Sequence, residues 1–152
     1  MVKWEEVKDI VEAWAKEFCE ALNNSPEYEA AAKGWGIDFD GAILMRMTHS
    51  GEMEFDAGAF VDLKDGKCLG INVIGPEDEP PRPPGLVLEG PMLLWKKLAF
   101  KELEPIQTIM KGELKVEGDM ALVMRYAQAA MMLADITEKT DRTWFTKWNL
   151  EG

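Results

Sequence analysis

Thiol and imidazole groups, which serve most often as nucleophiles and metal ligands, are rare in this 152-residue chain and widely spaced. They are limited to Cys19, Cys68 and His49. A structural zinc site needs about four nitrogen or sulfur ligands close together, so we expect no metal site and no cofactor. We expect Cys19 on a helix and Cys68 on a strand, both as free, buried thiols in a reducing compartment. The alternative, a Cys–His catalytic pair, requires a thiol and the histidine to meet in the fold.

His49 and Ser50 lie in residues 48–52, a stretch typical of a hairpin turn. A histidine beside a serine could act as a general base, but we interpret His49 as an exposed turn residue. The chain has no nucleophile elbow, P-loop, dinucleotide-binding glycine motif or zinc-protease motif. We therefore predict no catalytic residue, and an unrecognised hydrolase or transferase is the least favoured function.

The charge balance narrows the choice of partners. Lysine and arginine number 17 against 28 aspartates and glutamates, a net charge of −11. Nucleic-acid binding needs a clustered basic face, and anionic membrane surfaces attract basic segments, so we expect neither partner. The longest apolar run, residues 129–134, is far shorter than the ~20 residues of a membrane span. Acidic residues stand where a signal peptide would be apolar. These features predict an acidic cytoplasmic protein.

The first half of the chain has the periodicities of two helices and a β-meander. Apolar residues three or four apart predict an amphipathic helix over residues 4–22. Ser25 before Pro26 predicts a capped second helix through residue 32. Strands are expected over residues 38–48, 53–63 and 67–74. The alternation in the second strand and the turn at Asp65-Gly66 indicate an antiparallel meander with one solvated face.

The second half begins with a proline-rich stretch, residues 76–84, which holds five of the eight prolines. It could be a ligand for a partner domain, but we interpret it as a stiff, solvated loop. A strand over residues 85–89, helices over 91–99 and 105–110, and a strand over 113–117 follow. Asp119 is expected to cap a helix over residues 120–134. That helix is rich in methionine and apolar nearly all round, as expected of one that is buried on two sides or lines a cavity.

The most specific pattern is the 22-residue stretch PIQTIMKGELKVEGDMALVMRY, residues 105–126. It has a short helix, a Gly-x-Leu-x-Val strand, and Gly118-Asp119 opening a final helix. With the order of the other elements, it resembles the type-2 sterol carrier protein family. Weaker matches are Trp35, residues 63–66 and residues 90–95. The similarity covers residues 2–136.

This resemblance implies an α+β fold over residues 1–152 as a single domain. The family has a five-stranded, mainly antiparallel sheet with helices packed over one face, enclosing an apolar tunnel. The tunnel would hold a fatty acyl chain, acyl-CoA or a sterol. Its lining is expected from apolar positions on the helices that the family places around it: Met92, Trp95, Leu98, Ile106, Ile109, Met110, Met120, Val123, Met124, Ala127 and Met131.

The function that follows from this resemblance is non-enzymatic lipid binding or lipid transfer. The alternative is an accessory binding or dimerisation module that docks on an enzyme and presents an acyl substrate. The proline-rich loop and the acidic charge suit a surface that faces a partner, which could be an enzyme or a second copy of the chain.

The C-terminal tail, residues 137–152, is polar at first and then aromatic at Trp144, Phe145 and Trp148. Trp144 and Trp148 are four residues apart, so one helical turn would bring them to the same face. The tail could be a lid over one mouth of the tunnel. We favour the interpretation that it packs against the outside of the long helix and completes the core, because two indoles bury a large area.

Overall fold

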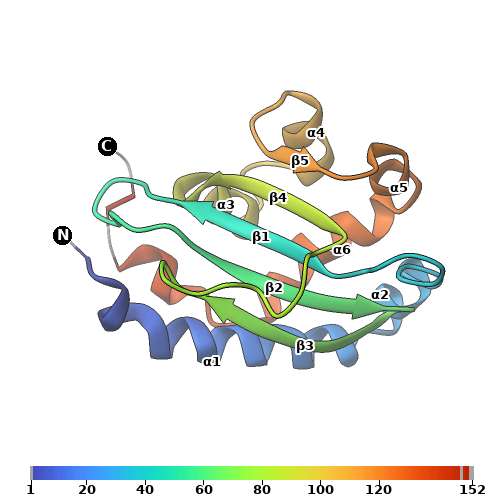
Figure 1. Ribbon diagram of the computed structural model, residues 1–152, viewed down its shortest axis with the longest axis horizontal. Coiled ribbons are helices and arrows are strands. Elements are labelled where there is room, and N and C mark those ends of the chain that lie inside the picture. The colour runs from blue at the N-terminus through green and yellow to red at the C-terminus, as the bar shows by residue number, and fades with distance from the viewer. Residues whose placement is uncertain (1, 148, 151–152) are drawn as a thin grey trace.

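The computed structural model describes residues 2–147 and 149–150, and its centre is a five-stranded sheet of order β3-β2-β1-β4-β5 (Figure 1). The strands are β1 (Ile43–Thr48), β2 (Ala57–Lys64), β3 (Lys67–Ile74), β4 (Leu86–Pro91) and β5 (Lys115–Glu117). Strands β1 and β4 pair in parallel, and all other neighbours are antiparallel. The predicted fold class, α+β with a mainly antiparallel five-stranded sheet, is confirmed.

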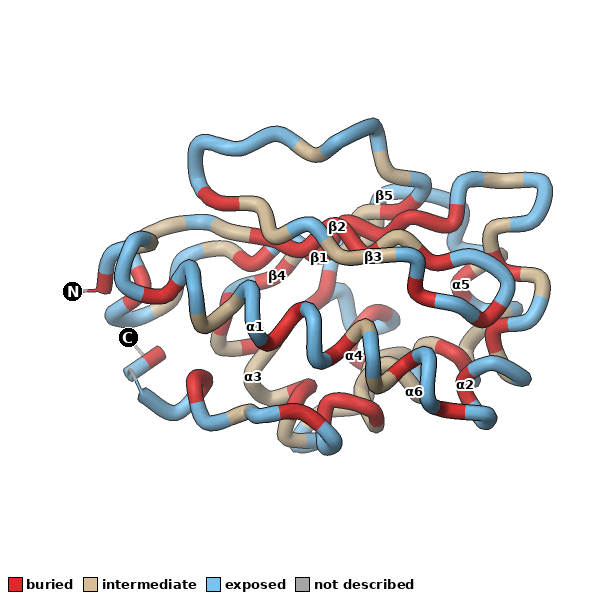
Figure 2. Tube along the Cα trace, turned by 90° about the horizontal axis from the view of Figure 1, so that it is seen from below, coloured by how far each residue is buried: buried red, intermediate tan, exposed pale blue. Residues whose placement is uncertain are grey.

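The helices cover one face of this sheet, and a long loop between β3 and β4 crosses the other (Figures 1 and 2). The helices are α1 (Trp4–Asn23), α2 (Pro26–Ala31), α3 (Met92–Ala99), α4 (Pro105–Met110), α5 (Met120–Arg125) and α6 (Ala127–Ile136). Two 3-10 turns follow, η1 (Thr137–Lys139) and η2 (Thr143–Thr146). The apolar stripe of α1 faces the sheet and buries Val7, Trp14, Phe18 and Leu22.

Strands β1 and β2 begin several residues later than the sequence predicts, whereas β4 and β5 begin one and two residues later. Strand β1 begins at Ile43 because Asp38 has a positive φ of 71°, and the Asp40 carboxylate accepts the Ala42 N–H, which makes a turn. Strand β2 begins at Ala57 because Ser50 and Met53 exchange two backbone hydrogen bonds of 2.9 Å and close a tight turn. Alternating polar and apolar residues in the sequence do not reveal such turns.

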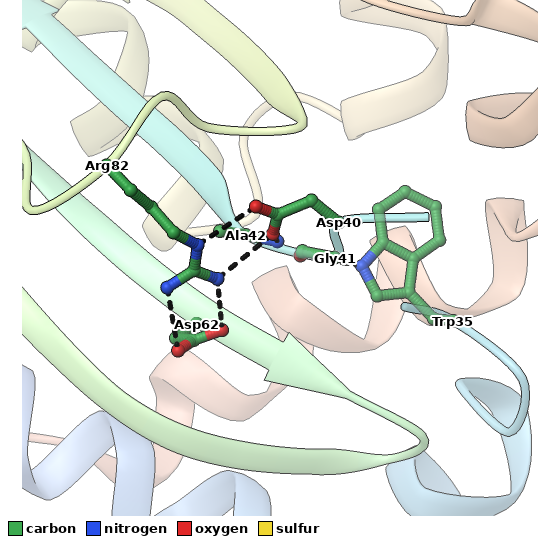
Figure 3. Close-up of polar contacts among 6 residues, drawn as sticks. All are labelled: Trp35, Asp40, Gly41, Ala42, Asp62 and Arg82. Carbon is green, nitrogen blue, oxygen red and sulfur yellow. Dashed lines mark hydrogen bonds and ion pairs between the residues drawn. The ribbon is translucent and has the colours of Figure 1, made fainter. Parts of the chain in front are cut away.

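The outer face of the sheet is not uniformly solvated, which corrects the expectation of one wet face. Phe60 on β2 is buried with Ala42 and Leu44 in a small second core. Arg82 of the proline-rich loop lies over the Phe60 ring, 5.1 Å from its centroid. Its guanidinium donates to the Asp40 carboxylate at 2.9 Å and to the Asp62 carboxylate at 3.0 Å (Figure 3). These contacts hold the proline-rich loop against the outer face of the sheet.

The contact between Arg82 and Asp40 predicts a pH-dependent effect of Asp40→Asn on stability. Arg82 holds the pKa of Asp40 below its usual value, chiefly through a hydrogen bond. A carboxyl group whose pKa is lower in the folded state than in the unfolded state stabilises the fold at pH values above its unfolded-state pKa, which is about 3.9 for aspartate. This stabilisation is lost as the pH falls through the folded-state pKa. We expect Asp40→Asn to lower the Tm slightly at pH 7, with the difference from wild type shrinking below about pH 4. Thermal melts across this pH range test it, and a constant difference would contradict it.

The expectation of two free thiols is wrong. Cys19 on α1 and Cys68 on β3 form a disulfide, with Cα atoms 5.5 Å apart. The Asn23 side chain also donates to the Cys68 carbonyl at 2.9 Å and accepts its N–H at 2.8 Å. Packing of α1 along β3 brings together two cysteines that are 49 residues apart in sequence. The cysteines therefore give no support for a reducing compartment, and the cytoplasmic location stays a prediction.

Replacing both cysteines by alanine is expected to destabilise the protein. A disulfide that closes a loop of about 50 residues contributes about 2–4 kcal/mol, mainly by restricting the unfolded chain. At about 2–4 °C per kcal/mol for a chain of this size, the Tm should fall by roughly 5–15 °C. The urea midpoint of the variant should equal that of wild type with its disulfide reduced. Ligand binding should persist below the unfolding transition, and an unchanged urea midpoint would contradict the disulfide's role.

The helix predicted over residues 120–134 is interrupted. Its predicted cap is confirmed, because the Asp119 carboxylate accepts the Ala121 N–H at 2.9 Å. At Tyr126 the backbone leaves the helical region (φ −105°, ψ 30°), which separates α5 from α6. The Tyr126 ring packs edge-on against Trp35 at 5.2 Å between centroids. This aromatic contact occupies the bend.

The C-terminal tail belongs to the core as far as it is described. Trp144 and Phe145 are buried, and both pack against Trp14 of α1. Phe145 also contacts Phe100. The expected packing surface, the outside of the long helix, is therefore corrected to α1 and the end of α3. Trp148 lies outside the described residues.

Candidate ligand-binding cavity

A cavity of about 120 Å³ lies between the inner face of the sheet and the helices. Its sheet side is made by alternate, inward-facing residues of the central strands: Ile43, Met45, Met47, Leu63, Leu86 and Leu88. Its helical side draws on all six helices and on Phe145 of the tail. It therefore lies at the junction of the two layers, where segments far apart in sequence meet.

The wall of this cavity is apolar and has no charged side chain. Most of its polar groups are already paired. The indole N–H of Trp35 donates to the Gly41 carbonyl at 2.8 Å, and that of Trp95 donates to the Arg46 and Gly90 carbonyls at 3.1 Å. The Thr137 hydroxyl is hydrogen-bonded to the Ala134 carbonyl at 2.6 Å. Such a wall suits an apolar ligand.

Two tyrosines are among the residues of the wall. Tyr28 on α2 is 1% exposed, and burial raises the pKa of its hydroxyl. Tyr126, at the bend between α5 and α6, is half-buried. The indole N–H of Trp144, a residue that lines a smaller neighbouring cavity, is buried without a hydrogen-bond partner in the described part of the chain.

The eleven lining residues expected from the resemblance are divided between the cavity and the surface. Four lie in the wall: Trp95, Leu98, Ile109 and Val123. Met92 lines the smaller cavity instead, Ile106 packs at the edge of the core, and Ala127 is half-buried. The other four are largely exposed: Met110, Met120, Met124 and Met131. Whether any of the eleven contacts a ligand stays a prediction.

The helical repeat accounts for much of this division, even though the helix is interrupted at Tyr126. Met120, Met124, Ala127 and Met131 share one face, and that face lies outside the cavity wall. Val123, Ala130 and Leu133, on another face of the same repeat, line the cavity. Sequence reasoning also missed the contributions of α1, α2 and the strands. The stripe of α1 and the alternation of β2 did signal buried faces, but not that those faces border a space.

In the described part of the chain, the side chains of His49 and Ser50 are paired with other groups and not with each other. The His49 side chain is exposed and its Nδ1 lies 3.2 Å from the Asp56 carboxylate. The Ser50 hydroxyl accepts the N–H of Leu93 at 3.1 Å and so caps the start of α3. Across residues 2–147 and 149–150, no group of three or more His, Cys, Asp and Glu side chains could hold a metal ion.

A two-layer α+β fold with an apolar, uncharged cavity between its layers is an arrangement that suits small apolar ligands. The sequence profile of the SCP-2 sterol transfer family matches residues 12–131, and the chain belongs to this family. This confirms the resemblance carried by residues 105–126 and assigns the protein to a family of lipid-binding and lipid-transfer proteins. None of the curated proteins matches the chain.

Solved structures agree with this assignment. The crystal structure of sterol carrier protein 2 has 29% identity and a TM-score of 0.75, covering 85% of this chain and 96% of that one. The solution structure of a conserved hypothetical protein from Thermus thermophilus, described as a candidate sterol carrier protein, has 29% identity and a TM-score of 0.73, covering 84% and 86%. The UbiJ-SCP2 ubiquinone synthesis protein shares the fold at 20% identity and a TM-score of 0.50, covering 91% and 97%. No helix in the described part of the chain is long and apolar enough to cross a membrane.

Proposed function

We propose that this protein binds the apolar chain of one lipid molecule in the cavity and carries it without a covalent step. The observation that supports this most directly is the apolar, uncharged wall, in which most polar groups are already hydrogen-bonded. A fatty acyl chain, acyl-CoA or a sterol are the candidate ligands. Trp95, Leu98, Ile109 and Val123 are the contacts that we retain from the expected lining.

The size of the cavity bears on how a lipid enters. At about 120 Å³ it is close to the engineered cavity of about 150 Å³ that binds benzene. A ring or short chain segment fits this space, and a longer chain requires the helices to separate. Pro105 on α4 and Leu133 and Ala134 on α6 belong to the wall and are only half-buried. We therefore propose that lipids enter between α4 and α6.

The energetics allow exchange of the ligand. Burying ~14 methylene groups at ~0.8 kcal/mol each gives about 11 kcal/mol. Association costs about 4–15 kcal/mol in lost translational and rotational freedom. The net affinity is then weak to moderate, as suits a protein that takes up and releases its cargo.

The alternative function is an accessory module that docks on an enzyme and presents an acyl substrate, or that works as a homodimer. Two observations support it: the fold is shared with a ubiquinone synthesis protein, and the chain has a net charge of −11 with an exposed proline-rich loop. In this case the same cavity would hold the acyl group while the acidic surface meets the partner.

Identification of bound lipid in the purified protein distinguishes the two functions. The protein is purified without detergent and weighed by native mass spectrometry, then denatured, and the extract is analysed for lipids. One lipid per chain in a monomer supports the carrier. A lipid-free protein that co-purifies stoichiometrically with an enzyme supports the accessory module. A lipid-free monomer that also fails to bind an added fluorescent fatty acid contradicts both.

A further inference from the structure

Tyr28 stands out among the residues of the cavity wall because the residue is almost fully buried and its hydroxyl is unpaired in the described part of the chain. The residue is 1% exposed and lines the cavity. Its backbone is held in place, since its N–H donates to the side chain of Ser25, the cap of α2, at 3.1 Å. The hydroxyl itself has no hydrogen-bond partner among residues 2–147 and 149–150, and desolvation is the sole cause of its raised pKa.

An unpaired buried hydroxyl destabilises a folded protein, because it has given up its hydrogen bonds to water. The comparable groups in this wall avoid that cost: the Trp35 and Trp95 indoles donate to carbonyls, and Thr137 is hydrogen-bonded to a carbonyl. Tyr126 is only half-buried. Tyr28 is thus the more deeply buried of the two wall tyrosines, and its hydroxyl is one that a ligand could satisfy.

The charge of the surroundings limits what that ligand group can be. No lysine, arginine or histidine lines the cavity. An ionised carboxylate or phosphate brought to Tyr28 would lose its hydration without gaining a counter-charge, which is costly in an apolar interior. A neutral oxygen loses far less on entering and still accepts the hydrogen bond. The raised pKa keeps the tyrosine protonated and able to donate.

We propose that Tyr28 selects the ligand by donating a hydrogen bond to the uncharged oxygen at the polar end of a single-chain lipid. The chemical class is a long-chain alcohol, ester or ketone, and the ionised fatty acid of the same length binds less tightly. This inference rests on the proposed lipid-binding function and adds to it which end of the lipid enters and what charge that end carries.

Tyr28→Phe tests the proposal because it removes the hydroxyl and keeps the ring. Dodecanol, dodecane and dodecanoate compete at pH 8 against a pyrene-labelled alkane bound to the full-length protein. We expect wild type to bind dodecanol more tightly than dodecanoate. Tyr28→Phe should weaken dodecanol binding about tenfold, the effect of one neutral hydrogen bond, and leave dodecane binding unchanged. In the absence of ligand the variant should have a higher Tm than wild type.

Thr108→Val is the matched control, since it removes a buried hydroxyl that is paired and lies outside the cavity wall. The Thr108 hydroxyl donates to the Glu104 carbonyl at 2.7 Å, so this variant should be less stable than wild type. Its ratio of dodecanol affinity to dodecane affinity should be the same as in wild type. If Tyr28→Phe leaves that ratio unchanged, or lowers the Tm of the free protein, the role of Tyr28 is wrong while lipid binding stands. If folded wild type binds none of the three probes, the proposed function fails and this inference with it.

Discussion

An Ala129→Phe variant is expected to stay folded and to lose at least tenfold in affinity for a fluorescent fatty acid. Ala129 is buried and lines the cavity from α6. The substitution adds one phenyl ring, and a cavity of about 150 Å³ is known to accept benzene. The ring should therefore occupy much of the space of about 120 Å³ that a lipid chain would enter. Because the cavity is already present, the usual overpacking cost of about 1–3 kcal/mol should be reduced.

Met124→Phe is the control for this experiment. Met124 is 41% exposed on α5 and lies outside the cavity wall, so its enlargement should leave affinity unchanged. The resemblance-based lining, which includes Met124, predicts a loss of binding instead. Titration of both variants, with circular dichroism to check folding, decides between the two. Normal binding by folded Ala129→Phe and loss of binding by Met124→Phe would show that the ligand occupies the surface predicted from the sequence.

Deletion of the residues after Thr137 is expected to lower the Tm sharply or to abolish folding. The deletion removes Trp144 and Phe145, each at most 3% exposed. It also removes Thr140, whose hydroxyl accepts the Trp14 indole N–H at 3.1 Å. Losing one buried Phe or Trp side chain costs about 3–5 kcal/mol, against a typical total stability of about 5–15 kcal/mol.

Point substitutions separate a core tail from a lid if the deleted chain does not fold. Trp144→Ala should destabilise the protein by about 3–5 kcal/mol in urea. Lys147→Ala, at an exposed position of the same tail, should have little effect. Ligand release is followed in parallel by transfer to vesicles. A tail that acts only as a lid would give faster release from Trp144→Ala with an unchanged urea midpoint.

Local periodicity was sufficient to predict the kind and order of the secondary structure. The stripe of α1, the Ser25 cap, strand β3 and the Asp119 cap lie where the sequence indicates, because each depends on residues within one or two turns of chain. The family motif at residues 105–126 then supplied the topology, including a sheet in which not all pairs are antiparallel. The starts of β1 and β2 were predicted too early, because the turn at Asp40 depends on a side-chain hydrogen bond and the turn at Ser50 on backbone hydrogen bonds, which no alternation pattern encodes.

The shape of the cavity and the state of the cysteines required the tertiary structure. Cys19 and Cys68 become a pair when α1 packs along β3, and a separation of 49 residues carries no sign of that approach. The helices over residues 120–136 have more than one apolar face, and packing leaves Met124 and Met131 exposed while Ala130 lines the cavity. A helical repeat predicts which residues share a face. It does not predict which of two apolar faces packs toward the sheet, because contacts with residues distant in sequence decide that.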